Sequence, residues 1–241
     1  MPAINDDLVS CFFSGDTLRS RRVGSVVLAG HVHVPAPPAR LVADWEREVR
    51  LHLALEPGEV EPLPLARARA RWPDYRHCVQ ATADWTAALG LPADWLAACD
   101  TALMACRGAS YHHDGARYGG MAFCNLFLSE DQGLDLHFPA AGQRIPLRRG
   151  TVVLFDTCQP HAVIARGSSG FDVADFPPAQ DCTQVFLTWE VPIESDAVAR
   201  LLGVTFDTEP TAALLLGEAH LWRGCAKANV CPATGQWCQG E

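Results

Sequence analysis

Short strand-like segments dominate the second half of the chain, and they constrain the fold more than any other feature. They are rich in β-branched and aromatic residues, and Gly, Pro, Asp and Ser separate them. This composition predicts short strands joined by tight turns. Closely spaced short strands are typical of an antiparallel sandwich or barrel such as a jelly roll. The segments are 119–131, 134–139, 143–147, 150–157, 161–166 and 182–192.

The first half of the chain has a different pattern. Residues 21–34 are rich in β-branched residues and predict a strand, whereas residues 41–55 place apolar residues at helical spacing. Residues 74–90 and 91–108 each end near a glycine and predict two further helices. The sequence therefore predicts an α+β fold, with a jelly-roll core behind a flanking N-terminal layer of helices.

A single domain accounts for this organisation. The chain has 241 residues, of which 49% are hydrophobic, so it can bury a sizeable core. We divide it into residues 1–108, the first strand and the supporting helices, and residues 109–192, the jelly-roll core. Residues 193–241 form a C-terminal extension that begins with a helix-like stretch.

Composition argues against several classes of function. The formal net charge is −9 and the pI is about 5.4, whereas nucleic-acid binding needs a basic face. No apolar run approaches the roughly 20 residues that span a bilayer. The N-terminus lacks the basic and then apolar order of a signal peptide. We therefore expect a cytoplasmic protein without membrane attachment, in which most of the ten cysteines are reduced.

The C-terminal extension holds one histidine and three cysteines that can bind metal. Their spacing is wider than the tight Cys-x-x-Cys arrangement of zinc knuckles, so the pattern is a weak indication of zinc. A structural zinc site, a disulfide and unligated thiols are all compatible with it, and unligated thiols are favoured. The residues are His220, Cys225, Cys231 and Cys238.

The strongest chemical signal is the sequence YHHDG at residues 111–115. Side chains alternate in an extended segment, so His112 and Asp114 project to one side and His113 to the other. His161 follows a strand and a proline-containing turn, and it is the best third ligand. Two histidines and one carboxylate leave open positions on an octahedral ion, as in non-haem Fe(II) oxygenases. Zinc more often takes a closed or three-histidine set.

Other histidines fit the third position less well. His137 lies soon after Asp114 and lacks the preceding glycine, strand and turn that frame His161. His31 and His33 alternate on an early strand without a carboxylate nearby, so they are expected to be core or surface residues. A His-x-Asp pair alone is common by chance, and the metal prediction therefore depends on its joint placement with the strands and with His161.

The stretch 111–192 resembles the Fe(II)/2-oxoglutarate-dependent dioxygenases, particularly their prolyl-hydroxylase-like branch. In that family a His-x-Asp precedes a strand with an asparagine, a glycine-rich hairpin and a glycine-led strand before the distal histidine. Here these are YHHDG, AFCNLFLSED with Asn125, GLDLHFP, and RRGTVVLFDTCQPHAV with His161. The resemblance implies a double-stranded β-helix, with Fe(II) and 2-oxoglutarate as cofactors and dioxygen as co-substrate. It also implies that His112, Asp114 and His161 are the iron ligands.

The resemblance further implies a cation for the far carboxylate of 2-oxoglutarate, because a guanidinium can donate two parallel hydrogen bonds to it. The usual position, at the start of the last core strand, is occupied here by Gln184. The anchor must then lie elsewhere. Arg166, five residues after His161, is the first candidate and Arg144, on a neighbouring strand, is the second. The remaining candidates are Arg117, Arg148 and Arg149.

Two polar residues are further candidates for co-substrate contacts. Tyr118 flanks the His-x-Asp and can donate a hydrogen bond to a bound carboxylate, although aromatic packing is the commoner role. Asn125 lies on a strand that should line the barrel, where its amide can contact the co-substrate.

The expected activity is hydroxylation or desaturation of an unactivated carbon in a small molecule, an amino acid or a secondary metabolite. Asp114 disfavours halogenation, because radical halogenases of this family have a small residue at that position. The segments 56–73 and 167–182 are expected to be loops over the site. Two alternatives stay open: a triad oxygenase that does not use 2-oxoglutarate, and a non-enzymatic, cupin-like metal-binding barrel. The oligomeric state is not indicated.

Overall fold

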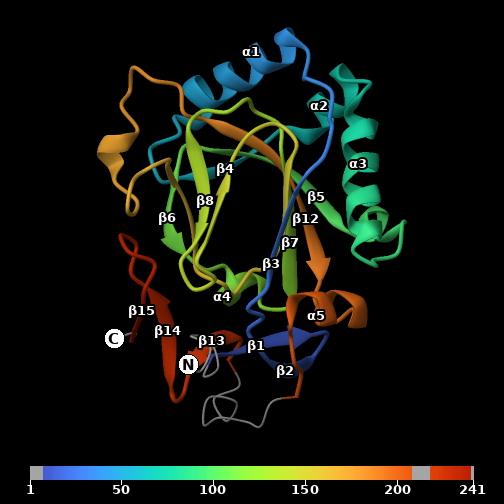
Figure 1. The fold of residues 1–241 in the computed structure, drawn as a ribbon, viewed down its shortest axis with the longest axis vertical. Coiled ribbons are helices and arrows are strands. Elements are labelled where there is room, and N and C mark those ends of the chain that lie inside the picture. Colours follow the sequence, from blue (N-terminus) through green and yellow to red (C-terminus); the bar gives the residue numbers. More distant parts are fainter. Residues whose placement is uncertain (1–7, 208–217, 240–241) are drawn as a thin grey trace.

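The computed structural model describes residues 8–207 and 218–239, which form three sheets and a layer of helices (Figure 1). All strand pairs among these residues are antiparallel. The largest sheet has the order β3 (Val27–His31), β10 (Thr151–Asp156), β7 (Met121–Phe127), β12 (Gln184–Pro192), β5 (Asp100–Cys106) and β4 (Val60–Leu63). The second sheet has the order β6 (Ala109–His112), β11 (His161–Ala165), β8 (Leu134–Phe138) and β9 (Gln143–Pro146).

The two ends of the chain meet in the third sheet, at the opposite end of the molecule from α1 (Figure 1). Its strands have the order β15 (Trp237–Gln239), β14 (Ala226–Val230), β13 (His220–Arg223), β1 (Leu8–Ser14) and β2 (Thr17–Arg22). The C-terminal extension therefore pairs with the N-terminal hairpin rather than forming a separate unit.

The helices are short. The longest, α3 (Tyr75–Ala88), has 14 residues, and no helix in the described part of the chain is long and apolar enough to cross a membrane. The helices are α1 (Ala39–Arg47), the π-helical η1 (Glu48–Leu53), α2 (Leu65–Arg71), α3, the 3-10 turn η2 (Trp95–Ala98), α4 (Gly115–Tyr118), the 3-10 turn η3 (Val173–Asp175) and α5 (Asp196–Leu202).

The large sheet is buried on both faces, because its side chains alternate between two apolar cores. In β7, Cys124 and Leu126 belong to the core that includes Trp45 and Trp72 of the helical side. Phe127 belongs instead to the second core, which lies between the large sheet and the four-stranded sheet. The helical layer, the large sheet and the smaller sheet thus lie in succession. This arrangement is compatible with the predicted jelly-roll-like core, and the double-stranded β-helix stays a prediction.

The six predicted core strands are confirmed, but the helix predicted over 91–108 is wrong. Only Trp95–Ala98 form a single 3-10 turn, and Asp100–Cys106 form the strand β5 between β12 and β4. Alanine, leucine and methionine favour helix locally, yet two neighbouring strands offer hydrogen bonds that override this preference. The irregular segment 56–73 likewise contains β4 and α2.

The helical layer approaches the sheet closely at Gly30 on β3. A Cβ at this position would lie 2.3 Å from Nε1 of Trp85 on α3. We expect Gly30→Ala to lower the free energy of unfolding by about 1–3 kcal/mol, because the half-buried indole, which packs against the core, must shift to make room. In a Trp85→Ala background the same substitution should cost almost nothing. Chemical denaturation of the four proteins measures this coupling, and equal costs in both backgrounds would contradict the packing.

Candidate metal centre

The strands β6 and β11 bring the two predicted histidine ligands together. His161 and His112 are direct partners across this antiparallel pair, and their ring centroids are 4.4 Å apart. Asp114 follows β6 just before α4, and its Oδ2 lies 3.5 Å from Nε2 of His161 and 3.9 Å from Nε2 of His112. One potential ligand atom from each residue lies within 4.8 Å of the others. These three side chains are therefore close enough to share one ion.

Backbone carbonyls fix both imidazoles. Nδ1 of His112 lies 2.7 Å from the carbonyl oxygen of Ser110, and Nδ1 of His161 lies 2.9 Å from that of Gln159. A ring nitrogen facing a carbonyl oxygen carries a proton, so in the neutral form of each ring Nε2 keeps its lone pair. Orientation through the second ring nitrogen is common among metal-binding histidines. Two such nitrogens and a carboxylate oxygen are a donor set that fits Fe(II).

The site is buried at one side and open at the other. The exposed fraction of the side chain is 9% for His161, 25% for Asp114 and 38% for His112. Burial, together with the neighbouring His112, lowers the pKa of His161 to about 3, so this imidazole is neutral near pH 7. Burial also raises the pKa of Asp114, although nearby positive groups oppose the shift. A cation between these groups would stabilise the ionised carboxylate.

Aromatic rings close the buried side of the centre. The ring of His161 has its centroid 5.0 Å from that of Phe155 and 5.9 Å from that of Phe138. Phe123 follows, 6.1 Å from Phe155, and Tyr118 lies 5.0 Å from Phe123. These rings keep water away from the inner side of the three ligands.

His113 points away from this centre, as strand alternation predicts. The amide of Gly115 donates to its Nδ1 at 3.2 Å, and its Nε2 lies 3.2 Å from the carbonyl oxygen of Ala228. Its ring packs against Trp237, with 5.7 Å between the centroids. His113 therefore fastens the C-terminal hairpin to the segment that carries the ligands.

The rival ligands lie elsewhere. His137, on β8, has its Nδ1 2.5 Å from the hydroxyl of Tyr111. Among the described residues, His112, Asp114 and His161 are the one group of three or more His, Cys, Asp and Glu residues close enough to share an ion. The C-terminal His220, Cys225, Cys231 and Cys238 are not gathered into such a group, and all ten cysteines are free thiols.

The arginines ranked first as carboxylate anchors are engaged with other groups. Arg166, at the far end of β11 from His161, donates to Asp135 at 2.9 Å and to Asp131 at 3.0 and 2.9 Å. Arg144 donates to the carbonyl oxygen of Ser168 and lies 4.0 Å from Asp135. Their aspartate partners are on the β7–β8 connection and on β8, so the pairing is not visible in the local sequence.

Arg117 is differently placed. It forms no ion pair within the described ranges, and its guanidinium lies 5.2 Å from the ring centroid of Tyr118. Its positive charge acts on Asp114, Tyr118 and Glu190. Arg117 is therefore a cation near Asp114 whose guanidinium N–H groups are not engaged in an ion pair within the described ranges. Arg149, by contrast, is paired with Glu130.

Three buried polar atoms face the inner core without a partner. Asn125 on β7 and Thr188 on β12 are direct strand partners, and Asn125 Oδ1 and Thr188 Oγ1 are both unpaired. Gln184 lies four residues before Thr188 on β12 and therefore faces the same side of the sheet. Its Oε1 is also unpaired, while its amide nitrogen donates to the Glu130 carbonyl oxygen at 3.3 Å. Buried polar atoms are rarely left without a partner, so these atoms are candidates for ligand contact. In the sequence, the alternation of side chains along β12 could have indicated that Thr188 faces the inner core.

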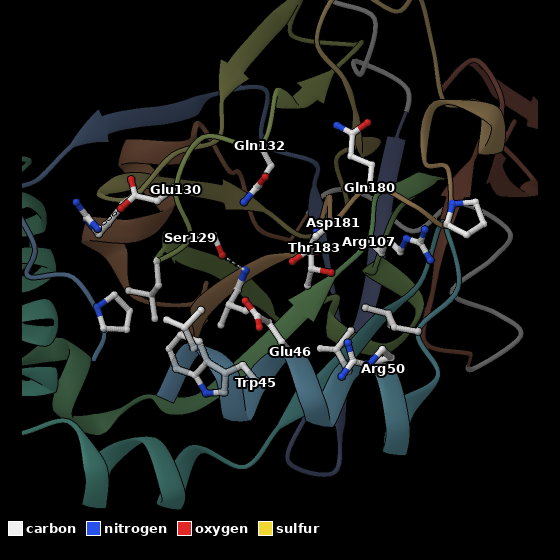
Figure 2. A pocket seen from close by; sticks show the side chains of 18 of the residues that line it. Trp45, Glu46, Arg50, Arg107, Ser129, Glu130, Gln132, Gln180, Asp181 and Thr183 are labelled. Atoms are coloured by element: carbon white, nitrogen blue, oxygen red, sulfur yellow. Dashed lines mark hydrogen bonds and ion pairs between the residues drawn. The ribbon is translucent and has the colours of Figure 1, made fainter. Parts of the chain in front are cut away.

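Two cavities lie at different ends of the large sheet. A cleft of about 450 Å³ lies over α4 and is lined by Arg117, Tyr118 and Glu190, among others. A cavity of about 770 Å³ is bordered by α1 and by residues 178–181 (Figure 2). The strand β7 starts near the metal centre and ends beside this cavity, a span of about 20 Å at ~3.3 Å per residue. Residues 178–181 of the expected lid therefore cover the far cavity and not the three ligands.

No family model matches this chain, and no curated protein matches it. Solved structures that are similar in arrangement include the following three. A prolyl-4-hydroxylase from Pseudomonas putida has 18% identity and a TM-score of 0.38, over 69% of this chain and 92% of the other. A viral collagen prolyl hydroxylase from Paramecium bursaria Chlorella virus-1 has 11% identity and a TM-score of 0.35, over 68% and 89%.

The third structure is the non-heme alpha-ketoglutarate-dependent epimerase SnoN from nogalamycin biosynthesis. It has 12% identity and a TM-score of 0.32, over 73% of this chain and 85% of the other.

The opposite orientations of His112 and His113 give a direct test. We expect His112→Ala to weaken Co(II) binding by about 100-fold or more, because it removes one of three ligands. His113→Ala should leave the Co(II) affinity within about threefold and should lower the free energy of unfolding by ~1 kcal/mol, through its lost hydrogen bonds. Titration of the visible Co(II) absorbance measures the affinity. Equal losses in the two variants would show that the wrong histidine has been assigned.

Proposed function

We propose that this chain is a non-haem Fe(II)- and 2-oxoglutarate-dependent oxygenase that hydroxylates or desaturates an unactivated carbon of a small molecule. The observation that carries the proposal is the convergence of the Nε2 atoms of two histidines and one carboxylate oxygen, with both rings fixed through Nδ1. Two histidines and one carboxylate on one face leave positions for a bidentate co-substrate and for dioxygen.

In this proposal His112, Asp114 and His161 hold the ion. A ferrous ion there would supply dioxygen activation coupled to the oxidative decarboxylation of 2-oxoglutarate to succinate and carbon dioxide. The chain itself fixes the orientation of the ligands and excludes water from one side of the site. The Gln159 and Ser110 carbonyls hold the imidazoles in one tautomer. Phe138 and Phe155 exclude water from the inner side.

Arg117 is the cation that we assign to the far carboxylate of the co-substrate. Its guanidinium has no carboxylate partner in the described structure, whereas Arg166 and Arg144 interact with Asp131, Asp135 or Ser168. Tyr118, on which the guanidinium lies, has a hydroxyl that can donate a second hydrogen bond. A guanidinium and a hydroxyl together suit one carboxylate.

The substrate is proposed to enter through the cleft over α4. Its volume of about 450 Å³ falls within the usual range for small-molecule pockets. The cleft combines the apolar Phe12 and Phe13 with the charged Arg117 and Glu190. A small molecule with an apolar body and a polar group, such as an amino acid or a secondary metabolite, fits this lining.

An oxygenase with the same ligands but without 2-oxoglutarate is the second candidate. The specific observation is Gln184, which occupies the start of β12 where the resemblance implies a cation. Gln184 is fully buried and pairs with a backbone carbonyl. In this candidate no group on the protein binds a distal carboxylate.

Anaerobic addition of Fe(II) and then 2-oxoglutarate separates these functions. We expect a visible charge-transfer band when the keto acid chelates the ion, and succinate release once oxygen and a substrate are supplied. Iron binding without the band would favour the second candidate. Absence of iron binding would contradict both and favour a non-enzymatic barrel.

Replacement of Arg117 tests the anchor. We expect Arg117→Met to raise the KM for 2-oxoglutarate by about 10- to 100-fold, since a charge-assisted hydrogen bond contributes ~1.5–3 kcal/mol. Arg166→Met is the matched control, because its guanidinium is held by Asp131 and Asp135. It should leave the KM unchanged and lower stability slightly. If Arg166→Met alone raises the KM, the sequence-based ranking was right and the assignment of Arg117 is wrong.

A further inference from the structure

A buried ion pair lies behind the metal centre, and the function proposed above gives it no role. Arg21 on β2 and Asp156 at the end of β10 are both fully buried. Nη1 of Arg21 donates to Oδ2 of Asp156 at 2.6 Å, and Nη2 donates to Oδ1 at 2.8 Å. The pair is therefore bidentate, with the planar geometry that only arginine offers.

The pair connects two segments of the chain. Nε of Arg21 donates to the carbonyl oxygen of Gly119 at 2.7 Å, at the end of α4. The carboxylate of Asp156 also accepts from the amides of Gly24 at 2.7 Å and Cys158 at 2.9 Å. One guanidinium thus fixes the end of α4 relative to the turn over residues 156–159.

These two segments hold the proposed ligands. The amide of Asp114, just before α4, donates to the carbonyl oxygen of Thr157 at 2.8 Å. The carbonyl oxygen of Gln159, in the same turn, accepts from Nδ1 of His161 at 2.9 Å. The turn 156–159 therefore contacts both the carboxylate ligand and the distal imidazole through backbone groups.

Close packing reinforces the same turn. The Thr157 hydroxyl donates to the carbonyl oxygens of Tyr118 at 2.7 Å and Met121 at 2.9 Å. A Cβ at Gly115 would lie 2.6 Å from Sγ of Cys158, so the turn and the start of α4 are in direct contact. A shift of the turn would move Asp114 and His161 relative to each other.

Stability alone does not explain a buried pair of this kind. The desolvation of two charges is so costly that apolar replacements of similar volume are often neutral or stabilising. We propose that Arg21 and Asp156 are positioning residues that set the distance between Asp114 and His161. Through them the N-terminal hairpin controls metal affinity. The metal consequence rests on the proposed function, whereas the positioning itself is a property of the metal-free protein.

The decisive variant is the double substitution Arg21→Met/Asp156→Leu, which removes both charges and replaces them with apolar side chains of similar volume. We expect it to fold with a lower melting temperature than the wild type, because the Gly119 carbonyl and the Gly24 and Cys158 amides lose a partner. Its Co(II) Kd should rise at least tenfold, and hydrogen exchange at the Asp114 amide of the metal-free protein should accelerate at least tenfold. The Val153 amide, inside β10, should keep its protection and serves as the internal reference.

Two further variants complete the test. Arg21→Lys retains a charge for Asp156 but cannot also reach Gly119, so it should fold and show smaller changes in the same direction. Arg19→Met is the matched control on the same strand, because Arg19 pairs with Glu194 and Asp207 and not with the turn. It should leave both readouts unchanged.

The outcomes distinguish the two levels of the proposal. Wild-type Co(II) affinity and wild-type Asp114 exchange in a folded Arg21→Lys or double variant would overturn the positioning role. If the double variant does not fold, the Arg21→Lys result decides. If the wild type shows no Co(II) binding that depends on His112, the proposed function fails, and the exchange rates of the metal-free proteins still decide whether the pair positions Asp114.

Discussion

The pairing of β6 with β11 is the interaction on which the site depends. It sets His161 directly opposite His112, and a change of register follows between His161 and Val163. Because side chains alternate along a strand, a slip of one residue would turn His161 to the other face of the sheet. Asp114 then depends on the next contact, the hydrogen bond from its amide to Thr157. Two backbone pairings thus determine the position of all three ligands.

The packing of the large sheet between two apolar cores explains why the strands that carry the ligands keep one register. The large sheet packs on helices with one face and on the four-stranded sheet with the other, so its register is determined by two apolar cores. The candidate metal centre lies at the edge of the second core, where Phe138 and Phe155 meet His161. The imidazole is buried because the core continues up to it, and His112 is more exposed because β6 is the edge strand of its sheet.

The parts of the molecule that the sequence predicts are those governed by local patterns. Strand alternation predicted that His112 and Asp114 share a side and that His113 does not, and the turn residues predicted the six core strands. The strand β5 was missed because its stability comes from β12 and β4, which are distant in sequence. The engagement of Arg166 and the orphaned Thr188 were missed for the same reason, since the groups around them come from other strands.

The apolar side chains of the inner core limit the directions in which a co-substrate bound at the three candidate ligands could extend. Phe127, Phe186 and Val153 occupy the space between the sheets, and the fully buried Gln184 stands where the resemblance implies a cation. A dicarboxylate extending inward from the ligands would place a charge in this apolar region, at a cost of several kcal/mol. The exposed fraction of the ligands rises from His161 to His112, so the accessible direction leads outward. The proposed function therefore assigns the co-substrate carboxylate to Arg117 and the substrate to the cleft over α4, whose lining includes Gly115, the residue after Asp114.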